Sequence, residues 1–196
     1  MADPAYIVDG VLTDGEAVVA IDTEVVGSAT GYVEFEDPAD GSSLDWCQFQ
    51  DLMILCHMRG THSATSVGGA IHFNDITGGY YNFTLLDVDN NSVRAYSEAS
   101  GSRCEAIVGF PGASSTANIF GGAVIHINDV NSGNNKQILT RFASDQANTT
   151  THGCGMTVCQ FRKSDPISKI KLFPGNGNWA VGTRFDLYGI LPRMVQ

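Results

Sequence analysis

Apolar and polar residues alternate along most of this chain in short segments, and this two-residue period is typical of β-strands. Leu52, Ile54, Cys56 and Met58 fall on one face of such a segment, and the residues between them fall on the other. Because the pattern recurs along the chain, we predict roughly ten strands. They span 32–35, 52–59, 70–73, 80–88, 104–110, 123–128, 136–142, 156–161, 167–173 and 184–191.

The segments between these strands have the composition of tight turns. Asn, Asp, Ser and Gly fill 89–91, 131–135 and 175–178, and Asn and Gly tolerate the positive φ angles that such turns require. No segment keeps apolar residues at helical spacing over three turns, and only 44–52 has room for one short helical turn. We therefore predict an all-β protein, an antiparallel, jelly-roll-like β-sandwich.

The length and the distribution of the segments predict one domain. The chain has 196 residues, which is room for one domain of ordinary to large size. We place the jelly-roll β-sandwich at 31–191, a short extended acidic N-terminal arm at 1–30 and a C-terminal tail at 192–196.

Composition excludes several classes of protein. Charged residues make up only 16% of the chain and apolar residues 43%, which excludes a disordered chain. Twenty-one acidic and eleven basic residues give a net charge of −10, so we expect no nucleic-acid partner. No run of 18 apolar residues occurs, so we expect no membrane partner. The first residues show neither the basic nor the apolar region of a signal peptide, which predicts synthesis in a cytoplasm.

The acidic and basic residues are segregated along the chain. Residues 1–58 contain twelve acidic residues and no Lys or Arg, whereas residues 162–196 contain six of the eleven bases. One interpretation is ordinary surface charge. The other is that the acidic N-terminal part lies on a basic surface, either of its own chain or of a neighbouring subunit, and the sequence leaves both open.

Five cysteines occur at irregular spacing. They are Cys47, Cys56, Cys104, Cys154 and Cys159. An odd number in a chain of this length does not fit the disulfide framework of a small secreted domain, so we predict five reduced thiols. A disulfide between Cys154 and Cys159 is the alternative.

Two patterns suggest metal sites, but simpler structures explain both. Asp87, Asp89, Asn91 and Glu98 have the spacing of a calcium loop, yet Ser92 stands where that loop needs Gly, and a β-hairpin turn explains the same residues. Two groups offer zinc-type ligands but lack a Cys-x-x-Cys pair, so buried thiols and loop histidines account for them better. The groups are Cys47, Cys56, His57 and His62, and His152, Cys154 and Cys159. We predict no metal and no cofactor.

No catalytic residues are predicted. The chain contains no Gly-x-Ser-x-Gly pentapeptide and no phosphate-binding glycine loop with its lysine, so we expect a protein that is not an enzyme. Trp179 follows the 175–178 turn and is a candidate for stacking on a glycan. The alternative, which we favour, places both Trp46 and Trp179 in the core.

The C-terminal segment carries a recognisable signature. Residues 167–173, the turn and aromatic step Gly175-Asn176-Gly177-Asn178-Trp179, and residues 181–190 with Leu187-Tyr188-Gly189-Ile190 follow in order. This segment resembles the ending of a family of tailed-bacteriophage virion proteins. Weaker similarities lie at 49–59 and at 70–81, where His72 replaces the arginine more usual in the family.

The resemblance implies a jelly-roll-like protein of the virion. Family members are described as capsid decoration proteins, head fibres or tail-fibre tips, and catalysis is not a family trait. We expect a structural virion protein, most simply a capsid decoration or cement protein bound to the major capsid protein or another virion protein. The alternative is a tail-fibre or spike module that binds a host surface glycan. Resemblance alone suggests a homotrimer.

The oligomer is expected to use the segregated charges and some apolar anchors. The candidate assembly contacts are Tyr6, Ile7, Val8, Val18, Val19, Arg162, Lys163, Lys169 and Arg184. Exposed aromatic residues such as Phe110, Phe120 or Trp179 are expected to supply apolar contact area.

Overall fold

In almost every strand of this protein, successive side chains alternate between the core and the surface. The computed structural model describes residues 7–8, 11–12, 18–41, 44–89, 92–145 and 152–191. Leu52, Ile54, Cys56 and Met58 are buried on the inner face of their strand, as their spacing predicts. Each of the ten predicted segments contains a strand, and one short 3-10 turn forms within the predicted 44–52 segment. The all-β prediction is therefore confirmed.

The strands are numbered along the chain. They are β1 (Ile7–Val8), β2 (Val11–Leu12), β3 (Val18–Val25), β4 (Val33–Glu36), β5 (Asp51–Met58), β6 (Ser66–Phe73), β7 (Tyr81–Asp89), β8 (Ser92–Gly101), β9 (Cys104–Pro111), β10 (Gly121–Asn128), β11 (Lys136–Asp145), β12 (His152–Phe161), β13 (Lys169–Pro174) and β14 (Arg184–Ile190), and the 3-10 turn is η1 (Trp46–Gln48).

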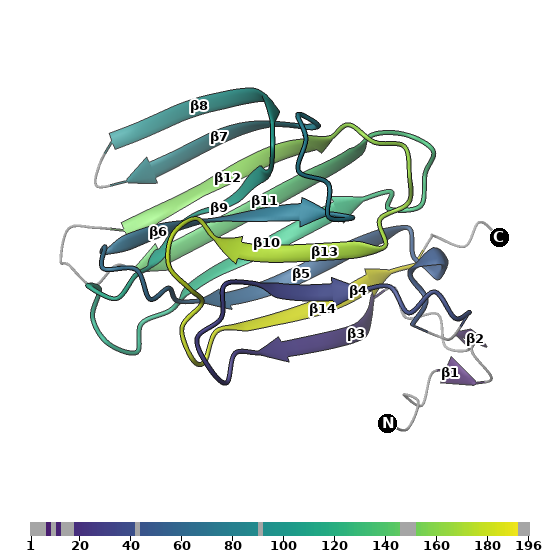
Figure 1. The fold of residues 1–196 in the computed structure, drawn as a ribbon, viewed down its shortest axis with the longest axis horizontal. Coiled ribbons are helices and arrows are strands. Elements are labelled where there is room, and N and C mark those ends of the chain that lie inside the picture. The colour runs from purple at the N-terminus through teal and green to yellow at the C-terminus, as the bar shows by residue number, and fades with distance from the viewer. Residues whose placement is uncertain are drawn as a thin grey trace.

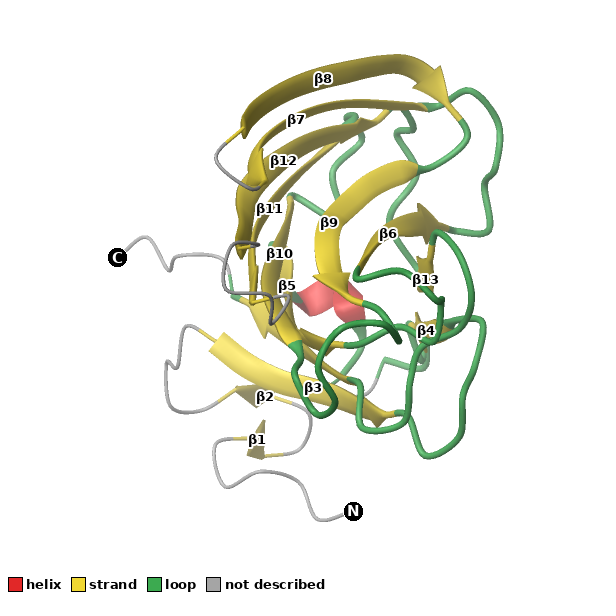
Figure 2. Ribbon diagram, turned by 90° about the vertical axis from the view of Figure 1, so that its left-hand side faces the viewer, coloured by secondary structure: helices red, strands yellow, loops and turns green. Residues whose placement is uncertain are grey.

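Two antiparallel sheets face each other as a sandwich (Figures 1 and 2). The larger sheet has eight strands in the order β3-β14-β5-β10-β11-β12-β7-β8, and the smaller has four in the order β4-β13-β6-β9. Four nested antiparallel pairs join strands that are distant in sequence: β3 with β14, β4 with β13, β5 with β10, and β6 with β9. This nesting, distributed over two sheets, is the topology of a jelly roll, and it confirms the predicted fold class.

Two hairpins are inserted into the roll. The β7–β8 hairpin lies between β6 and β9 in the sequence, and the β11–β12 hairpin lies between β10 and β13. Both extend the larger sheet beyond β10. We call β3, β14, β5 and β10 the roll half of this sheet, and β11, β12, β7 and β8 the inserted half. In Figures 1 and 2 the inserted half reaches past the smaller sheet and ends at β8.

The core lies between the two sheets and is rich in aromatic residues. Trp179 is fully buried, with its ring 5.0 Å from that of Phe110 and 5.1 Å from that of Phe185. Its indole Nε1 donates a hydrogen bond to the carbonyl of Leu172 at 3.1 Å. Buried tryptophans usually satisfy their N–H in this way. The interpretation that places Trp46 and Trp179 in the core is confirmed.

A disulfide crosses the core, which corrects the expectation of five reduced thiols. Cys104 on β9 and Cys159 on β12 are both buried, with their Cα atoms 6.0 Å apart, and they form the bond. Cys159 therefore pairs with Cys104 and not with Cys154, which is exposed. Fifty-five residues separate the two cysteines, so only the packing of the two sheets brings them together.

The N-terminal boundary of the domain lies earlier than residue 31. β3 pairs with β14 along the edge of the larger sheet, and its Val19 is fully buried in the core. Residues 18–30 are therefore part of the sandwich and not of an arm, because a strand whose backbone is paired and whose side chain packs inside belongs to the sheet. β1 and β2 pair with each other.

The signature segment is the closing part of the roll. It forms β13, the 175–178 turn and β14, and β14 lies between β3 and β5. Gly182 has φ +87°, a conformation that glycine adopts without strain. Gly189 lies under the ring of Phe49: a Cβ at this position would come within 2.3 Å of a ring carbon. The glycines of the signature therefore serve the fold.

Candidate assembly surface

The outer face of the larger sheet is the surface that points away from the core. Cross-strand pairing aligns its side chains in rows, because paired residues of neighbouring antiparallel strands point to the same side. One row crosses all eight strands. It consists of Thr23, Asp186, Leu55, Val124, Arg141, Met156, Leu86 and Ala95.

Exposed apolar side chains gather on the inserted half of this face. Leu86 and Val88 on β7 lie beside Met156 and Val158 on β12, and each is at least 38% exposed. Val93 on β8 pairs with Val88 and is 71% exposed. Contiguous apolar side chains at a surface mark a place where another molecule binds. We call these five residues the apolar patch.

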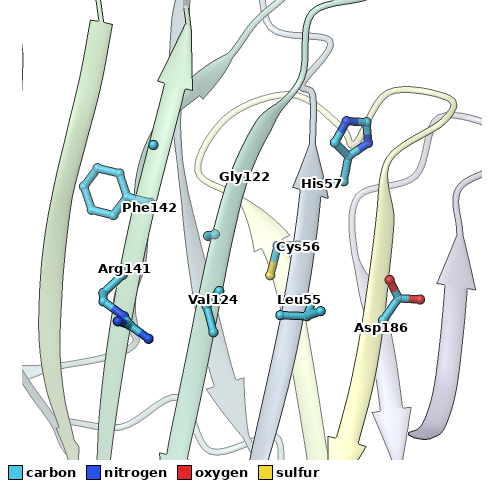
Figure 3. Close-up of a pocket in the computed structure, with 10 residues that line it drawn as sticks. Leu55, Cys56, His57, Gly122, Val124, Arg141, Phe142 and Asp186 are labelled. Carbon is cyan, nitrogen blue, oxygen red and sulfur yellow. The ribbon is translucent and has the colours of Figure 1, made fainter.

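A shallow hollow lies on the same face, across β14, β5, β10 and β11 (Figure 3). It has a volume of about 670 Å³. Figure 3 shows Asp186 on one side of it and Arg141 on the other, with Leu55 and Val124 between them. The hollow therefore offers an apolar floor with one charge of each sign at its sides.

Two titratable groups that line the hollow, Cys56 and Asp186, have shifted pKa values. Burial raises the pKa of the Cys56 thiol, with a smaller contribution from Asp186, so Cys56 is neutral at physiological pH. Burial also acts to raise the pKa of Asp186, but hydrogen bonds from Arg184 and Thr23 outweigh it, and the pKa is lowered overall. Arg184 Nε donates to Asp186 Oδ1 at 2.8 Å.

The outer face of the smaller sheet carries a network of ion pairs instead. Lys169 Nζ lies 3.1 Å from Glu34 and 3.0 Å from Asp75, and it also contacts Glu36. Lys171 Nζ lies 2.9 Å from Glu34 and 2.6 Å from Asp75. The hydrogen bond from Lys171 lowers the pKa of Glu34 and also that of Asp75. Acidic β4 thus pairs with basic β13 within one chain.

This network answers part of the question that the charge segregation raises. Lys169 and Arg184, two of the predicted assembly contacts, bind carboxylates of their own chain. Arg162 donates to the Gly79 carbonyl and to Ser100 Oγ, and Lys163 Nζ lies 4.1 Å from the centre of the Tyr80 ring. All four predicted basic contacts are engaged within the chain, and for Lys169 the reason is that β13 pairs with the N-terminal strand β4.

Three predicted aromatic anchors lie elsewhere than expected. Phe110 and Trp179 are buried, so neither provides exposed contact area. Trp179 also cannot stack on a glycan, because the core covers its ring. Phe120 is partly buried and stacks on His57, with ring centroids 4.4 Å apart. The turn position after 175–178 suggested an exposed ring, but the paired β-bridges of Trp179 with Thr30 and Gly60 hold it inside.

The N-terminal candidates divide into three groups. Tyr6 lies outside the described residues. Ile7 and Val8 form β1, and only their backbone is described. Val18 is exposed beside Ile190 at the edge of the larger sheet and remains a candidate contact. Val19 is buried in the core, so its prediction as an assembly contact is wrong.

The residues with metal-ligand spacing are dispersed over the structure: most lie on strands, Cys47 lies in η1, His62 lies in a loop, and Asn91 is outside the described residues. Asp87 on β7 accepts a hydrogen bond from Arg94 Nε at 3.0 Å across the β7–β8 hairpin. Cys56 points inward and His57 outward on β5. In the described parts of the chain, no three His, Cys, Asp or Glu side chains come together in a way that could hold a metal ion.

Sequence reasoning missed the apolar patch. The signal was present in the segment 81–88, where Tyr81, Phe83 and Leu85 share one face while Leu86 and Val88 lie on the other. Apolar residues on both faces of one strand indicate that both faces are covered by something. In the part of the chain that the structure describes, only the inner face of β7 is covered.

Comparisons with known proteins add little to this geometry. No protein-family model matches the chain. No curated protein matches it either. Among solved structures, one similar chain is the CBM2 module of the evolved Dit of Lactobacillus casei BL23 phage J-1. It is 11% identical, the alignment covers 84% of this chain and 70% of that one, and the TM-score is 0.21. A similarity this low does not establish a shared fold. Among the described residues, no helix is long and apolar enough to cross a membrane.

Proposed function

We propose that this protein is a non-enzymatic structural protein of a tailed-phage virion. In this proposal it binds the outer shell of the capsid as a decoration or cement protein, and its partner is the major capsid protein or another virion protein. The observation that carries the proposal is the apolar patch on the inserted half of the larger sheet. An exposed apolar surface of this kind in a protein of low charge content indicates a binding face.

The composition of the face supports attachment to another protein. Met156 and Leu86, which lie opposite each other, supply apolar area at its centre, while Arg141 and Gln137 on β11 are exposed polar residues beside it. Protein interfaces combine an apolar centre with a polar rim in this way. The shallow hollow on the neighbouring strands continues the face toward β14.

The position of the patch supports a division of labour between scaffold and binding surface. The signature shared with phage virion proteins lies in β13, the 175–178 turn and β14, all of which close the roll. The patch lies on the two inserted hairpins, outside this signature. A shared roll with different insertions would let related proteins bind different sites, because function resides in surfaces carried on a fold.

Glycan binding at a fibre tip is the competing function. It depended on an exposed Trp179, and that side chain is fully buried and hydrogen-bonded in the core. The location of the protein on the virion separates the two functions directly.

The first experiment is gold labelling of purified virions of the phage that encodes the protein, observed by electron microscopy. We expect label over the whole capsid shell. Label confined to the tail tip would contradict the capsid assignment and favour the fibre. Unlabelled virions would contradict the virion role.

The second experiment tests the patch by substitution. Met156→Asp places a charge at its centre, and Val181→Asp places the same charge at an apolar residue that is 61% exposed in a turn outside the patch. We expect capsids that lack the protein to bind wild type and Val181→Asp equally, and Met156→Asp at least ten-fold more weakly. Equal binding of the two variants would contradict the proposal.

A further inference from the structure

Among the strands that the structure describes, β8 has a neighbour on only one side, so one backbone edge of the larger sheet is unpaired there. It is the terminal strand of the sheet, and every residue from Ser92 to Ser100 is exposed. Figure 1 shows it at the margin of the sheet, away from the smaller sheet. A strand of this length with a free row of N–H and C=O groups is a template for another strand.

The side chains on the inner face of β8 have a self-complementary order. Arg94, Tyr96 and Glu98 share this face because they pair with the inward residues of β7. Arg94 Nε donates to Asp87 at 3.0 Å, and the Tyr96 hydroxyl donates to Glu98 at 3.1 Å. A positive and a negative side chain therefore lie at equal distances on either side of one tyrosine, each held by a contact within the chain.

We propose that β8 pairs antiparallel with β8 of a second copy about a two-fold axis at Tyr96. In this register Tyr96 faces Tyr96, and each Arg94 faces Glu98 of the other copy. The same surface is used by both copies, as in most two-fold dimers. The eight-stranded sheets of the two copies join into one continuous sheet, which is strand addition between identical chains.

Opposite-charge pairing favours this register over its neighbours, because a shift of two residues sets Arg94 or Glu98 opposite Tyr96 and loses both Arg94–Glu98 pairs. A shift of four residues in one direction places Arg94 opposite Arg94, and the same shift in the other direction places Glu98 opposite Glu98. Like charges directly opposite each other destabilise a strand pair, and opposite charges stabilise it. On the outer face, the chosen register sets Ala95 against Ser97 and Val93 against Ala99, so no like charges meet there.

The contact is argued from β8 alone and does not depend on the proposed virion role. It is a two-fold contact, and it therefore differs from the trimer that the family resemblance suggests. It also places the apolar patches of two copies on the same side of one sheet. A pair of linked patches binds a repeating surface more tightly than a single patch does.

Sedimentation of the purified full chain tests the contact. We expect wild type to form a dimer, whereas Glu98→Arg, which sets Arg against Arg94, should be monomeric. The matched control is Glu24→Arg, which makes the same charge change on β3, the opposite edge strand of the sheet, and should remain a dimer. A monomeric wild type, or a Glu98→Arg variant that associates as strongly as wild type, overturns the proposal.

Mixing two variants tests the register. Arg94→Glu alone sets Glu against Glu98 and should be monomeric, but a mixture with Glu98→Arg restores both opposite-charge pairs and should sediment as a heterodimer. A mixture that stays monomeric, while both variants melt as wild type does, overturns the register.

Crosslinking tests the two-fold axis without Arg94→Glu, which also loses its contact with Asp87. The thiols of Tyr96→Cys would lie directly opposite each other, within disulfide reach. Those of the control Ser97→Cys would be offset diagonally and should not join. Mild oxidation should give covalent dimers of Tyr96→Cys above the background of wild type, which has exposed Cys47 and Cys154. Equal crosslinking of both variants overturns the proposal.

Discussion

The two halves of the larger sheet differ in what covers them. The roll half lies opposite the smaller sheet, and its inward residues, such as Ile54 and Phe185, are fully buried. The inserted half is covered only in part: β9 contacts β11 and β12, whereas β8 is exposed along nine consecutive residues. Both halves therefore contribute inward residues to the core, but the inserted half ends in a strand, β8, that presents only surface.

This difference shows how one continuous sheet can serve two purposes. All eight strands from β3 to β8 are hydrogen-bonded to their neighbours, so backbone hydrogen bonds fix the inserted half relative to the roll half. The inward residues of the inserted half on β11, β12 and β7, such as Phe161 and Tyr81, still pack in the core, whereas the side chains of β8 from Ser92 to Ser100 are exposed. Substitutions should therefore have large effects in the roll half and small effects at the end of the inserted half.

The largest expected effect comes from Trp179→Ala in the roll. The side chain is fully buried against Phe110 and Phe185, and truncation of a buried Trp costs about 3–5 kcal/mol. The matched change in the inserted half is Val93→Ser, which should change the free energy of unfolding by no more than about 0.5 kcal/mol. Denaturant unfolding measures both, and similar losses would abolish the distinction between the halves.

A second test removes the bond between the smaller sheet and the inserted half. The double variant Cys104→Ala/Cys159→Ala opens a loop of 55 residues. The loss of this constraint on the unfolded chain should lower the free energy of unfolding by up to about 4 kcal/mol. We expect faster hydrogen exchange in β11 and β12 than in β5 and β14.

Alkylation of the unfolded, unreduced wild type should modify three cysteines, Cys47, Cys56 and Cys154. Modification of all five would show that the bond does not form.

A third test compares two glycines of the larger sheet. Gly189→Ala forces the ring of Phe49 to move, and overpacking of this kind costs about 1–3 kcal/mol. Gly122→Ala on β10 is the control, because the nearest atom to its new Cβ is the Cys56 carbonyl oxygen at 3.9 Å. Thermal melting should separate the two clearly. Equal melting temperatures would show that Phe49 has another place to go.

The smallest effect is expected from the ion pairs on the smaller sheet. The pKa values of Glu34 and Asp75 are lowered in the folded chain, so these groups stabilise the fold above their unfolded pKa values. This stabilisation is lost as the pH falls through the lower folded values. Lys171→Met should remove part of it, about 0.2–1 kcal/mol per pair near pH 7, and should flatten the acid side of the stability profile. Melting from about pH 7 to about pH 3 measures this, and an unchanged profile would contradict it.

The alternation of apolar and polar residues predicted the strands that have one buried and one exposed face. It failed for strands whose two faces are equally exposed. Leu52, Ile54 and Cys56 revealed β5 because one face is buried and the other is not. β8 was missed because it is exposed on both faces, so its residues show no period. β3 was taken for an arm because only its pairing with β14, more than 150 residues away, shows its place.

The surface was harder to predict than the fold. The sequence places Lys169 and Glu34 in distant segments, and only the β4–β13 pairing shows that one neutralises the other. The same holds for Cys104 and Cys159, whose partnership depends on how two sheets pack. Trp179 looked like a loop residue because its neighbours are turn formers, although its ring fills the core. The spacing of residues along one sequence does not show which side chains will meet across strands or between sheets.

The place of β14 in the larger sheet has a consequence for folding during synthesis on the ribosome. This strand is made after all the others, yet it lies between β3 and β5, so until it emerges the sheet has a gap that no other described strand fills. The hairpins β7–β8 and β11–β12 can form during synthesis, because each pairs residues that are close in sequence. The roll cannot close until β14 has been synthesised. Closure across so long a stretch of sequence is slow. The nascent chain therefore carries its exposed hairpins before it has a core to hold them.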